Sequence, residues 1–346
     1  MSTIQVIIPC YNYARYLRSC VDSVLSQDGV EVSVLIIDDC SSDNSLEVCR
    51  ELANADKRVS FIRHEINRGH IATYNEGLEL ASSDYLVLLS ADDLLTPGAL
   101  HRAAEVLDRN PSVGFVYGHA VTFSDHLPSS IRTKSSGHTI WRGADWIEIM
   151  CRTGRNFIVC PEVVMRTSVQ HRIGGYDPGL PHSGDMEMWL RAASVSDVGH
   201  LRGVDQAFYR SHALSMQRTV HAGLLFDLNG RYEAFKSALS KQAAQLPDVE
   251  QLFAKAKHAL ARTALRYAVE VTKCDVKLQP PVNLYEDFAK KIDPEATATR
   301  EWRALCRARG KSQGSIEALI TRLVADLRGR IVWRLWRHFG VHHFIQ

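Results

Sequence analysis

The sequence predicts an α/β fold in which a mostly parallel mixed sheet is flanked by helices and followed by a helical C-terminal region. Short apolar runs alternate with stretches of helical spacing through the first hundred residues, and the runs are 4–8, 32–37, 59–63 and 85–89. Near-continuous apolar strands that alternate with helices are typical of a parallel sheet buried on both faces. Strand signals become few after about residue 221. We therefore expect a sheet domain at 1–220 and a helical accessory region at 221–346.

A helix-like stretch follows each of these strand-like runs. Leu17, Val21 and Val24 recur at helical spacing after the first run, and 46–52 and 71–80 repeat the pattern after the second and third. After the fourth, Thr96-Pro97 predicts the start of a helix that runs to about Arg109, because proline at a first helical turn leaves no N–H unpaired.

The middle of the chain, about 112–220, has a different pattern of apolar and polar residues. Short apolar pieces are separated by polar loops that contain glycine and proline, and these pieces are 113–117, 157–160, 163–165 and 208–210. Such short, interrupted strands predict the mixed half of the sheet, with its loops arranged around a site.

Composition excludes several classes of protein. Hydrophobic residues make up 45% and charged residues 23%, which is ordinary for a folded protein. The net charge of +2 argues against a dedicated nucleic-acid binder. The eight cysteines form no C-x-x-C pair, so neither a zinc site nor a disulfide framework is indicated. No signal-peptide pattern and no run of ~18 apolar residues occurs, so we expect a cytoplasmic protein without a membrane span.

The end of the chain, 322–338, combines an apolar stripe with several arginines. Leu323, Leu327 and Ile331 recur at helical spacing. Such a helix packs on the rest of its protein, mediates self-association, or lies on an anionic membrane surface, here the inner face of the membrane. The sequence leaves these alternatives open.

Two clusters of carboxylates follow apolar strands. Asp92 and Asp93 end the run that begins at Tyr85, and 38–43 holds three more aspartates after the second run. Burying unpaired charge costs free energy, whereas ligands of open α/β sheets bind just outside the carboxyl ends of the strands. Hard oxygen ligands there suit a divalent cation that grips phosphates. The alternatives are a solvated turn for the Asp92–Asp93 pair and helix N-capping for Asp43.

The ordered motifs resemble those of family 2 glycosyltransferases, which have the nucleotide-sugar-binding fold called GT-A. The resemblance covers roughly 4–220. Its motifs are Val6-Ile-Ile-Pro-Cys-Tyr-Asn12, Asp38-Asp-Cys-Ser-Ser-Asp43, Asn67-Arg-Gly69, Ser90-Ala-Asp-Asp93, Gly174-Gly-Tyr-Asp177, Gly184-Asp-Met-Glu-Met-Trp189 and Tyr209-Arg-Ser-His212. Each motif alone is weak evidence, but their order and spacing together give a specific signal.

The resemblance implies roles in donor binding. Pro9 and Tyr11 would contact the nucleotide, with Tyr11 as a stacking platform for the base, a contact worth ~1–3 kcal/mol. Asp39 would accept a hydrogen bond from the ring N–H of the base, and Asp92 would lie near the ribose. Asp93 would bind Mn²⁺ or Mg²⁺ and, through the cation, the donor diphosphate.

The resemblance also implies the catalytic base. The matching position is Asp185, which removes the proton of the acceptor hydroxyl in inverting members; the alternative is a plain helix N-cap. The family commonly has Glu immediately before this Asp, where this chain has Gly184. Glu187 and Trp189 are weaker candidates on the acceptor side.

Two residues late in the motif series are further candidates. His212 matches a family histidine near the metal or diphosphate, although a lone histidine is more often a surface or core residue. Arg210 is a weaker candidate for the diphosphate, because arginines beside strands usually form structural pairs.

The expected function is that of an inverting, metal-dependent enzyme. It transfers a sugar from a nucleotide diphosphate donor, a UDP-sugar, to a hydroxyl of a glycan or lipid-linked saccharide, as in cell-surface polysaccharide synthesis. The alternative is a non-catalytic nucleotide-sugar-binding module with a decayed acceptor site. A dinucleotide-dependent oxidoreductase is disfavoured, since the turn after the first strand reads Pro9-Cys-Tyr-Asn12 instead of a glycine-rich loop. A nucleotidyltransferase is disfavoured as well, because the basic glycine-rich loop that such an enzyme normally carries early in its chain is missing here.

Overall fold

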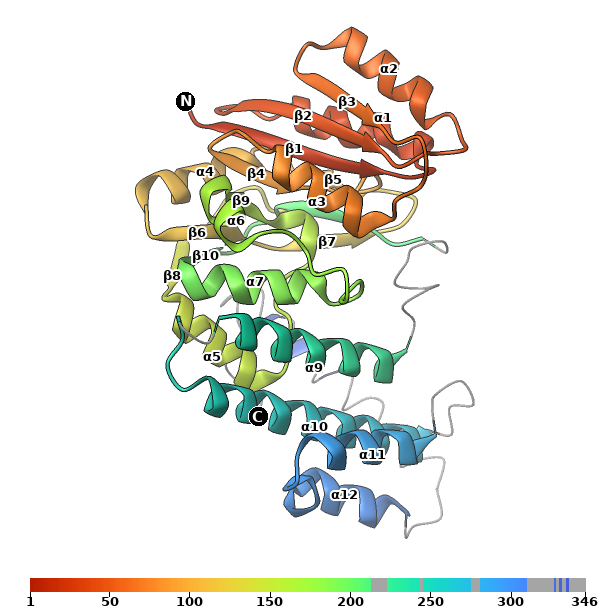
Figure 1. Ribbon diagram of the computed structural model, residues 1–346, viewed down its shortest axis with the longest axis vertical. Helices are drawn as coiled ribbons and strands as arrows, with labels where there is room; N and C mark the ends of the chain where they lie inside the picture. The colour runs from red at the N-terminus through yellow and green to blue at the C-terminus, as the bar shows by residue number, and fades with distance from the viewer. Residues whose placement is uncertain are drawn as a thin grey trace. The chain divides into compact units, whose positions relative to one another are not determined.

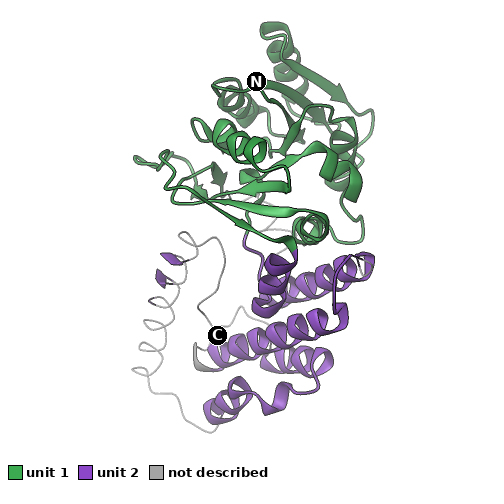
Figure 2. Cartoon of the chain, turned by 90° about the vertical axis from the view of Figure 1, so that its left-hand side faces the viewer, with its two compact units in different colours: residues 1–143, 158–213 green, residues 144–157, 214–346 purple. Residues whose placement is uncertain are grey.

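The computed structural model describes residues 1–212, 223–242, 245–274 and 281–309, together with positions 327, 330, 331, 334 and 335. The arginine-rich segment 322–338 therefore lies largely outside the described residues. The chain divides into two compact units (Figure 2). One comprises 1–143 and 158–213, which we call the sheet unit, and the other comprises 144–157 and 214–346, which we call the helical unit.

Strands and helices alternate in the first part of the sheet unit. The order is β1 (Thr3–Cys10), α1 (Ala14–Leu25), β2 (Glu31–Asp38), α2 (Ser45–Ala55), β3 (Val59–Arg63), α3 (His70–Leu80), β4 (Tyr85–Leu88), β5 (Leu94–Leu95) and α4 (Ala99–Arg109). There follow β6 (Val113–Tyr117), β7 (Ala120–Phe123), β8 (His138–Trp141), η1 (Cys160–Glu162), β9 (Val164–Arg166), α6 (Thr167–Ile173), α7 (Gly184–Val195), β10 (Asp197–Leu201) and β11 (Ala207–Arg210). Helix α5 (Gly143–Thr153) begins at the boundary between the units.

The main sheet has eight strands in the order β3-β2-β1-β4-β9-β6-β10-β8 (Figure 1). Strands β1 to β4 are parallel, whereas β9 pairs antiparallel with both β4 and β6. Strands β5, β11 and β7 form a second, smaller sheet. Because β1 lies between β2 and β4, the chain leaves all three strands at one edge of the sheet.

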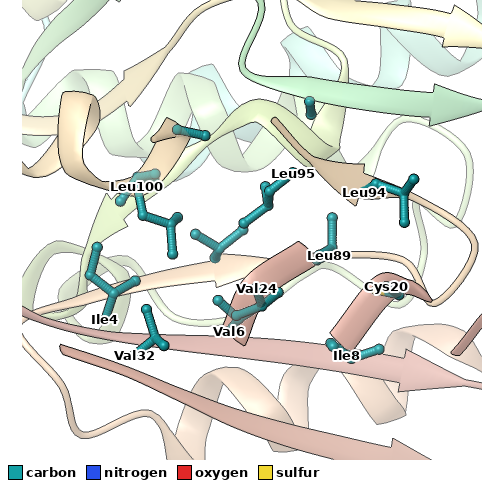
Figure 3. Close-up of a cluster of buried hydrophobic side chains, with 14 of the residues drawn as sticks. Ile4, Val6, Ile8, Cys20, Val24, Val32, Leu89, Leu94, Leu95 and Leu100 are labelled. Carbon is teal, nitrogen blue, oxygen red and sulfur yellow. The ribbon is translucent and has the colours of Figure 1, made fainter. Parts of the chain in front are cut away.

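Alternation along β1 assigns its side chains to two faces. Ile4, Val6 and Ile8 join the buried cluster formed with α1 and α4, where Val24 and Leu100 lie (Figure 3). Full burial of one such aliphatic side chain contributes ~1.5–3 kcal/mol. The opposite face of β1 packs against α3.

That opposite face requires a close approach of helix and strand. A Cβ at Gly77 in α3 would lie 2.3 Å from Cγ2 of Ile7 and 3.2 Å from Cδ1 of Ile37. Only glycine therefore lets α3 settle on the sheet at this depth.

The local structure differs from the sequence expectation in two places. Helix α4 begins at Ala99, after Gly98 at φ 71°, so Pro97 precedes the helix and does not form its first turn. Residues 157–160 form no strand, because Pro161 has no N–H for a ladder and the chain enters the short 3₁₀ helix η1 instead. Strands β5, β7, β8 and β10 were not expected individually.

The helical unit is built around one long helix. This helix is α10 (Val249–Cys274), and the other main elements are α9 (Leu224–Lys241), α11 (Val282–Ile292), η2 (Ala296–Ala298) and α12 (Arg300–Arg309). Helix α10 packs against α9, α11 and α12. Arg262 of α10 pairs with buried Glu301 of α12 at 3.0 Å. Among the described helices, none combines the length and apolarity needed to cross a membrane.

Candidate active site

The loops after β1 and β2 are tied together at the carboxyl edge of the sheet. Asn12, with φ 59°, accepts a hydrogen bond from the Ser42 N–H at its Oδ1 (2.8 Å), and its own N–H donates to Ser41 Oγ (2.9 Å). Pro9 is the penultimate residue of β1 and is half-buried, whereas Tyr11 is 49% exposed. Tyr11 thus presents a ring that a planar ligand can reach.

Asp39 follows β2 and is held by three donors. Its Oδ1 lies 2.7 Å from His64 Nδ1 and accepts the Arg68 N–H at 2.7 Å, while its Oδ2 accepts the Gly69 N–H at 2.9 Å. Burial alone would raise the pKa of this carboxyl, but these hydrogen bonds lower it below its usual range. Asp39 is therefore a fixed carboxylate, and His64 continues the chain of contacts to Glu76 Oε2 at 3.0 Å.

Asp92 and Asp93 are buried in the turn between β4 and β5. Asp92 Oδ2 lies 3.0 Å from His212 Nε2, and Asp93 Oδ1 accepts the Arg210 backbone N–H at 2.8 Å. Burial raises the pKa of both carboxyls, and the charge of Asp92 raises that of Asp93 further. The two residues therefore form an adjacent pair of buried carboxyls whose charged forms are disfavoured.

The Arg210 side chain is held by groups of the protein. Its guanidinium lies 4.4 Å from the ring centroid of Tyr16 and 4.3 Å from that of Phe123. Its Nε donates to the Asp92 carbonyl (2.9 Å) and its Nη1 to that of Ser124 (3.0 Å). These contacts fix the guanidinium beside the carboxylate pair.

A divalent cation fits the chemistry of the Asp92–Asp93 pair. Hard carboxylate oxygens are the donors that Mg²⁺ and Mn²⁺ prefer. A positive ion would offset the burial that raises the pKa values of both carboxyls and the charge of Asp92 that raises the pKa of Asp93 further. Among the described residues, no group of three or more His, Cys, Asp or Glu side chains forms a complete metal cage. Remaining ligands would therefore come from substrate phosphates and water, as is usual for such cations.

Asp185 lies in the first turn of α7, which begins at Gly184. Ser183 is the N-cap, so the alternative interpretation of Asp185 as the capping residue is wrong. Its Oδ1 accepts a hydrogen bond of 2.7 Å from the hydroxyl of Tyr176. Burial raises the pKa of Asp185, and hydrogen bonds from Tyr176 and Cys160 offset part of that rise.

The two weaker acceptor-side candidates point into the protein. Glu187 is 0% exposed and pairs with Arg191 at 2.8 Å. Trp189 is 3% exposed and stacks on Phe115 with ring centroids 5.7 Å apart. The structure therefore does not bring either side chain to the surface of the site.

A groove of about 760 Å³ runs along the exposed side of α3. It begins at Arg68 and Gly69, whose N–H groups hold Asp39, and reaches Glu79 and Pro178. The groove therefore adjoins the residues that fix Asp39.

Sequence reasoning missed His64 and Tyr176. His64 directly follows β3, so its position at the same sheet edge as Asp39 was available as a signal. Tyr176 stands in the motif Gly174-Gly-Tyr-Asp177, but that motif did not indicate its contact with Asp185, because the contact depends on how the loop before α7 folds back.

Comparison with known proteins agrees with this architecture. The model of glycosyl transferase family 2 matches residues 5–168. Chondroitin synthase of Pasteurella multocida is 27% identical over 202 residues, 58% of this chain and 20% of that protein. An uncharacterised glycosyltransferase of Nostoc is 36% identical over 115 residues, 33% of this chain and 35% of that one. The aligned region is thus a fifth to a third of these relatives' length.

Solved structures show the same fold. Residues 1–349 of TarS from S. aureus, in complex with UDP-GlcNAc, superpose with a TM-score of 0.62 at 16% identity, covering 86% of this chain and 83% of that one. The mannosyltransferase PcManGT from Pyrobaculum calidifontis, in complex with GDP-Man and Mn²⁺, gives 0.51 at 17% identity, covering 87% of both chains. The expected GT-A-type α/β fold followed by a helical region is confirmed.

Proposed function

Because the chain belongs to glycosyl transferase family 2, we propose that it transfers a sugar from a UDP-sugar to a hydroxyl of a glycan or lipid-linked saccharide, with inversion at the anomeric carbon. The observation that carries this proposal is the convergence of strand-end groups: β1 lies between β2 and β4, so Tyr11, Asp39 and the Asp92–Asp93 pair follow neighbouring parallel strands. A nucleotide diphosphate needs these parts together, namely an aromatic platform, fixed acceptors and a cation site.

Donor binding is assigned to the carboxyl edge of the sheet. Tyr11 stacks on the base beside Pro9, Asp39 accepts the ring N–H, and Asp92 contacts the ribose. Asp93, with His212, holds Mn²⁺ or Mg²⁺, which when bound supplies Lewis-acid stabilisation of the leaving phosphate. Support comes from the two raised carboxyl pKa values and from the contact between His212 and Asp92.

Arg210 has a different part in this proposal. Its guanidinium is held between two rings and two carbonyls, so it adds positive charge near the diphosphate without leaving its place. Its backbone N–H orients Asp93 at the same time.

Asp185 acts as the base. Its carboxylate takes the proton of the acceptor hydroxyl while the acceptor oxygen bonds to the anomeric carbon and the bond from that carbon to the phosphate oxygen breaks. One displacement of this kind inverts the anomeric configuration. A raised pKa suits a base working near neutral pH, since proton affinity grows with pKa.

Names of similar proteins support the substrate class. TarS was solved with UDP-GlcNAc, and two matching proteins of Pasteurella multocida are a chondroitin synthase and a hyaluronan synthase. A UDP-sugar donor and a role in polysaccharide synthesis are consistent with these names.

The domain extents 1–220 and 221–346, the cytoplasmic location and any self-association or membrane contact stay predictions.

A non-catalytic nucleotide-sugar-binding module is the second candidate. The observation that favours it is Gly184, where the family commonly has Glu. Both candidates bind a donor, and only the first turns it over.

A thermal-shift panel tests the proposal. UDP, UDP-GlcNAc, GDP and GDP-mannose are added with and without MnCl₂. A ligand at a hundred times its Kd stabilises by about 2.7 kcal/mol, so the melting temperature of the sheet unit should rise by roughly 5–10 °C with a uridine ligand plus Mn²⁺. If none of the nucleotides raises the melting temperature at any concentration, donor binding is contradicted.

NMR of donor turnover then separates the two candidates. The anomeric proton of UDP-GlcNAc is followed with the full chain, Mn²⁺ and a pool of glycan acceptors. Growth of a product with the opposite anomeric configuration supports the inverting enzyme, whereas binding without any turnover of the donors that bind supports the module.

A further inference from the structure

The main chain of Tyr176 is clamped to helix α3. Asn75 Oδ1 accepts the Tyr176 N–H at 2.7 Å, and Asn75 Nδ2 donates to the Tyr176 carbonyl at 3.0 Å. A Cβ at Gly175 would lie 2.3 Å from Asn75 Oδ1, so the preceding glycine permits this approach. Tyr176 therefore has a fixed backbone position although it lies in the loop between α6 and α7.

The ring of Tyr176 fills the space beside Gly184. The residue is 4% exposed, and its ring packs edge-on against Tyr74 with centroids 5.5 Å apart. A Cβ at Gly184 would lie 2.8 Å from Tyr176 Cδ1, closer than real Cβ contacts come. The ring and a side chain at 184 exclude each other, so Gly184 and Tyr176 form one steric unit.

The Tyr176 hydroxyl reaches the proposed base. It donates to Asp185 Oδ1 at 2.7 Å, which is within the short range of hydrogen bonds from a hydroxyl to a charged oxygen. Cys160 Sγ lies 4.0 Å from the same hydroxyl. The hydrogen bond ties one oxygen of Asp185 to a group whose own position is fixed by α3.

We propose that Tyr176 is the positioning residue of Asp185. Gly184 has no side chain and so leaves the space that the Tyr176 ring needs to reach Asp185. This inference rests on the proposed role of Asp185 as the base. It explains why a glycine precedes Asp185 here: the buried hydroxyl comes from the loop before α7, and the space above 184 is needed for its ring. Gly184 is then a sign of a differently supported base and not of a decayed site.

The hydrogen bond also sets the protonation of Asp185. Ionisable groups from several neighbouring elements interact electrostatically with this carboxyl, namely His70 and Tyr74 of α3, Cys160 of η1, Tyr176 and His182 of the loop, and Tyr209 of β11. Burial raises the pKa of Asp185, and the Tyr176 hydroxyl is the first of the groups that lower it. Removing that hydroxyl leaves the effect of burial and takes away its main counterweight.

A carboxyl titration by NMR tests the inference without any substrate. The full chain is labelled with ¹³C at aspartate Cγ, and the Asp185 resonance is assigned by its loss in Asp185→Asn. In Tyr176→Phe its titration midpoint should move to higher pH by about one to two units, the shift expected for loss of a hydrogen bond to a charged group. Tyr74→Phe is the matched control, since it removes a hydroxyl from the same aromatic cluster and should leave the midpoint in place.

Other outcomes separate the possible failures. An unchanged midpoint in a folded Tyr176→Phe overturns the inference. If that variant fails to fold, Gly184→Ala, which displaces the ring, gives the same reading: a raised midpoint supports the inference and an unchanged one overturns it. Full turnover by Asp185→Asn overturns the proposed base instead, and that result comes from a turnover assay independent of the titration.

Discussion

Asp92 and Asp93 are neighbours in sequence, yet different groups hold them. Asp92 contacts the His212 ring, whereas within the described residues Asp93 accepts a backbone N–H, that of Arg210. Asp93 is also the more buried of the two, at 2% exposed. A carboxylate in such surroundings needs a cation more than its neighbour does, which supports assigning the metal to Asp93.

Asp93→Asn should abolish the stabilisation that Mn²⁺ adds to UDP binding. The amide keeps an oxygen for the Arg210 N–H, so the fold should survive while the charge is lost. The measurement is the melting temperature with UDP, with and without MnCl₂. Asp287→Asn, at an exposed position of α11, is the control. A Mn²⁺-dependent rise that persists in Asp93→Asn contradicts the metal assignment.

Asp185 should set the acidic limb of the rate profile. The proposed base works only when it is deprotonated, and burial raises the pKa of Asp185. As the pH is lowered, kcat/KM should therefore begin to fall at a higher pH than it would with an ordinary aspartate. Asp185→Asn should keep UDP binding and lose transfer by ~10²–10⁴-fold. The measurements are kcat/KM from pH 4 to 9 and the UDP-induced thermal shift. Loss of donor binding together with transfer would point to a structural role.

Helix α3 connects the proposed donor side of the site with the proposed base. Glu76 contacts His64, which supports Asp39, and Asn75 clamps Tyr176, which supports Asp185. The two residues are adjacent on one helix, so a displacement of α3 changes both sides of the site. We therefore expect the depth at which α3 packs to affect both donor binding and the proposed base.

Gly77→Ala tests that depth. The added methyl would meet Ile7 Cγ2 at 2.3 Å in a close-packed interior, which typically costs 1–3 kcal/mol and outweighs the gain of ~1 kcal/mol in helix propensity. We expect a lower unfolding free energy in urea and weaker UDP binding. Ile7→Ala in the same chain removes the clashing methyl, so the double variant should be more stable than the sum of the two single changes predicts. Simple additivity would show that the contact does not limit the packing.

The two compact units are not consecutive in sequence. Residues 144–157 group with the helical unit although residues on both sides belong to the sheet unit. Within this segment, Trp146 and Phe157 pack edge-on at 5.9 Å. The sheet unit therefore cannot be isolated by a single cut.

A chain that ends at residue 220 should be less stable than the full chain. The cut removes the helices that group with 144–157 and leaves that apolar segment without them. We expect a lower melting temperature and aggregation. A second truncated chain, in which a short Gly/Ser linker replaces 144–157, is the control and should recover solubility. Equal melting temperatures of the cut and full chains would show that 1–220 is an independent domain.

Glu162 couples the stability of the sheet unit to pH. It is 2% exposed, and burial raises its pKa well above the usual range. The folded state then keeps a proton that the unfolded state loses above about pH 4.3. Unfolding free energy should therefore fall by up to about 1.4 kcal/mol per pH unit above that value, until the folded pKa is reached.

Glu162→Gln should remove this slope, because the amide cannot ionise and keeps an acceptor for the Val159 N–H. The measurement is urea unfolding at pH 5, 6 and 7, following the transition that UDP shifts, since a chain of two units need not unfold in one step. A parallel pH dependence in the variant and the natural chain would contradict the assignment.

Sequence periodicity predicted the part of the fold that depends on local pattern. The four apolar runs became β1 to β4, because a parallel strand buried on both faces, as β4 is, must be apolar throughout. Strand β3 matches its expected bounds although it lies at an edge of the sheet and is only partly buried. Strands β5, β7 and β8 were missed, because two to four residues carry too few positions for a clear pattern. Strand β10 was missed because Gly199 and His200 interrupt its apolar residues. Pro97 was misplaced because a left-handed Gly98, invisible to periodicity, sets where α4 begins.

The sequence by itself determined which groups reach the sheet edge. The carboxyl ends of neighbouring parallel strands lie at one edge of the sheet, so carboxylates that follow these strands lie there too. Tertiary structure alone decided how those groups are supported. The links from His64 to Asp39, from Arg210 to Asp93 and from Tyr176 to Asp185 join residues 9 to 117 positions apart, and the link from Arg210 is made by its backbone N–H, which no residue pattern predicts. Chain order constrains where a strand ends, whereas only packing fixes which loop folds back over it.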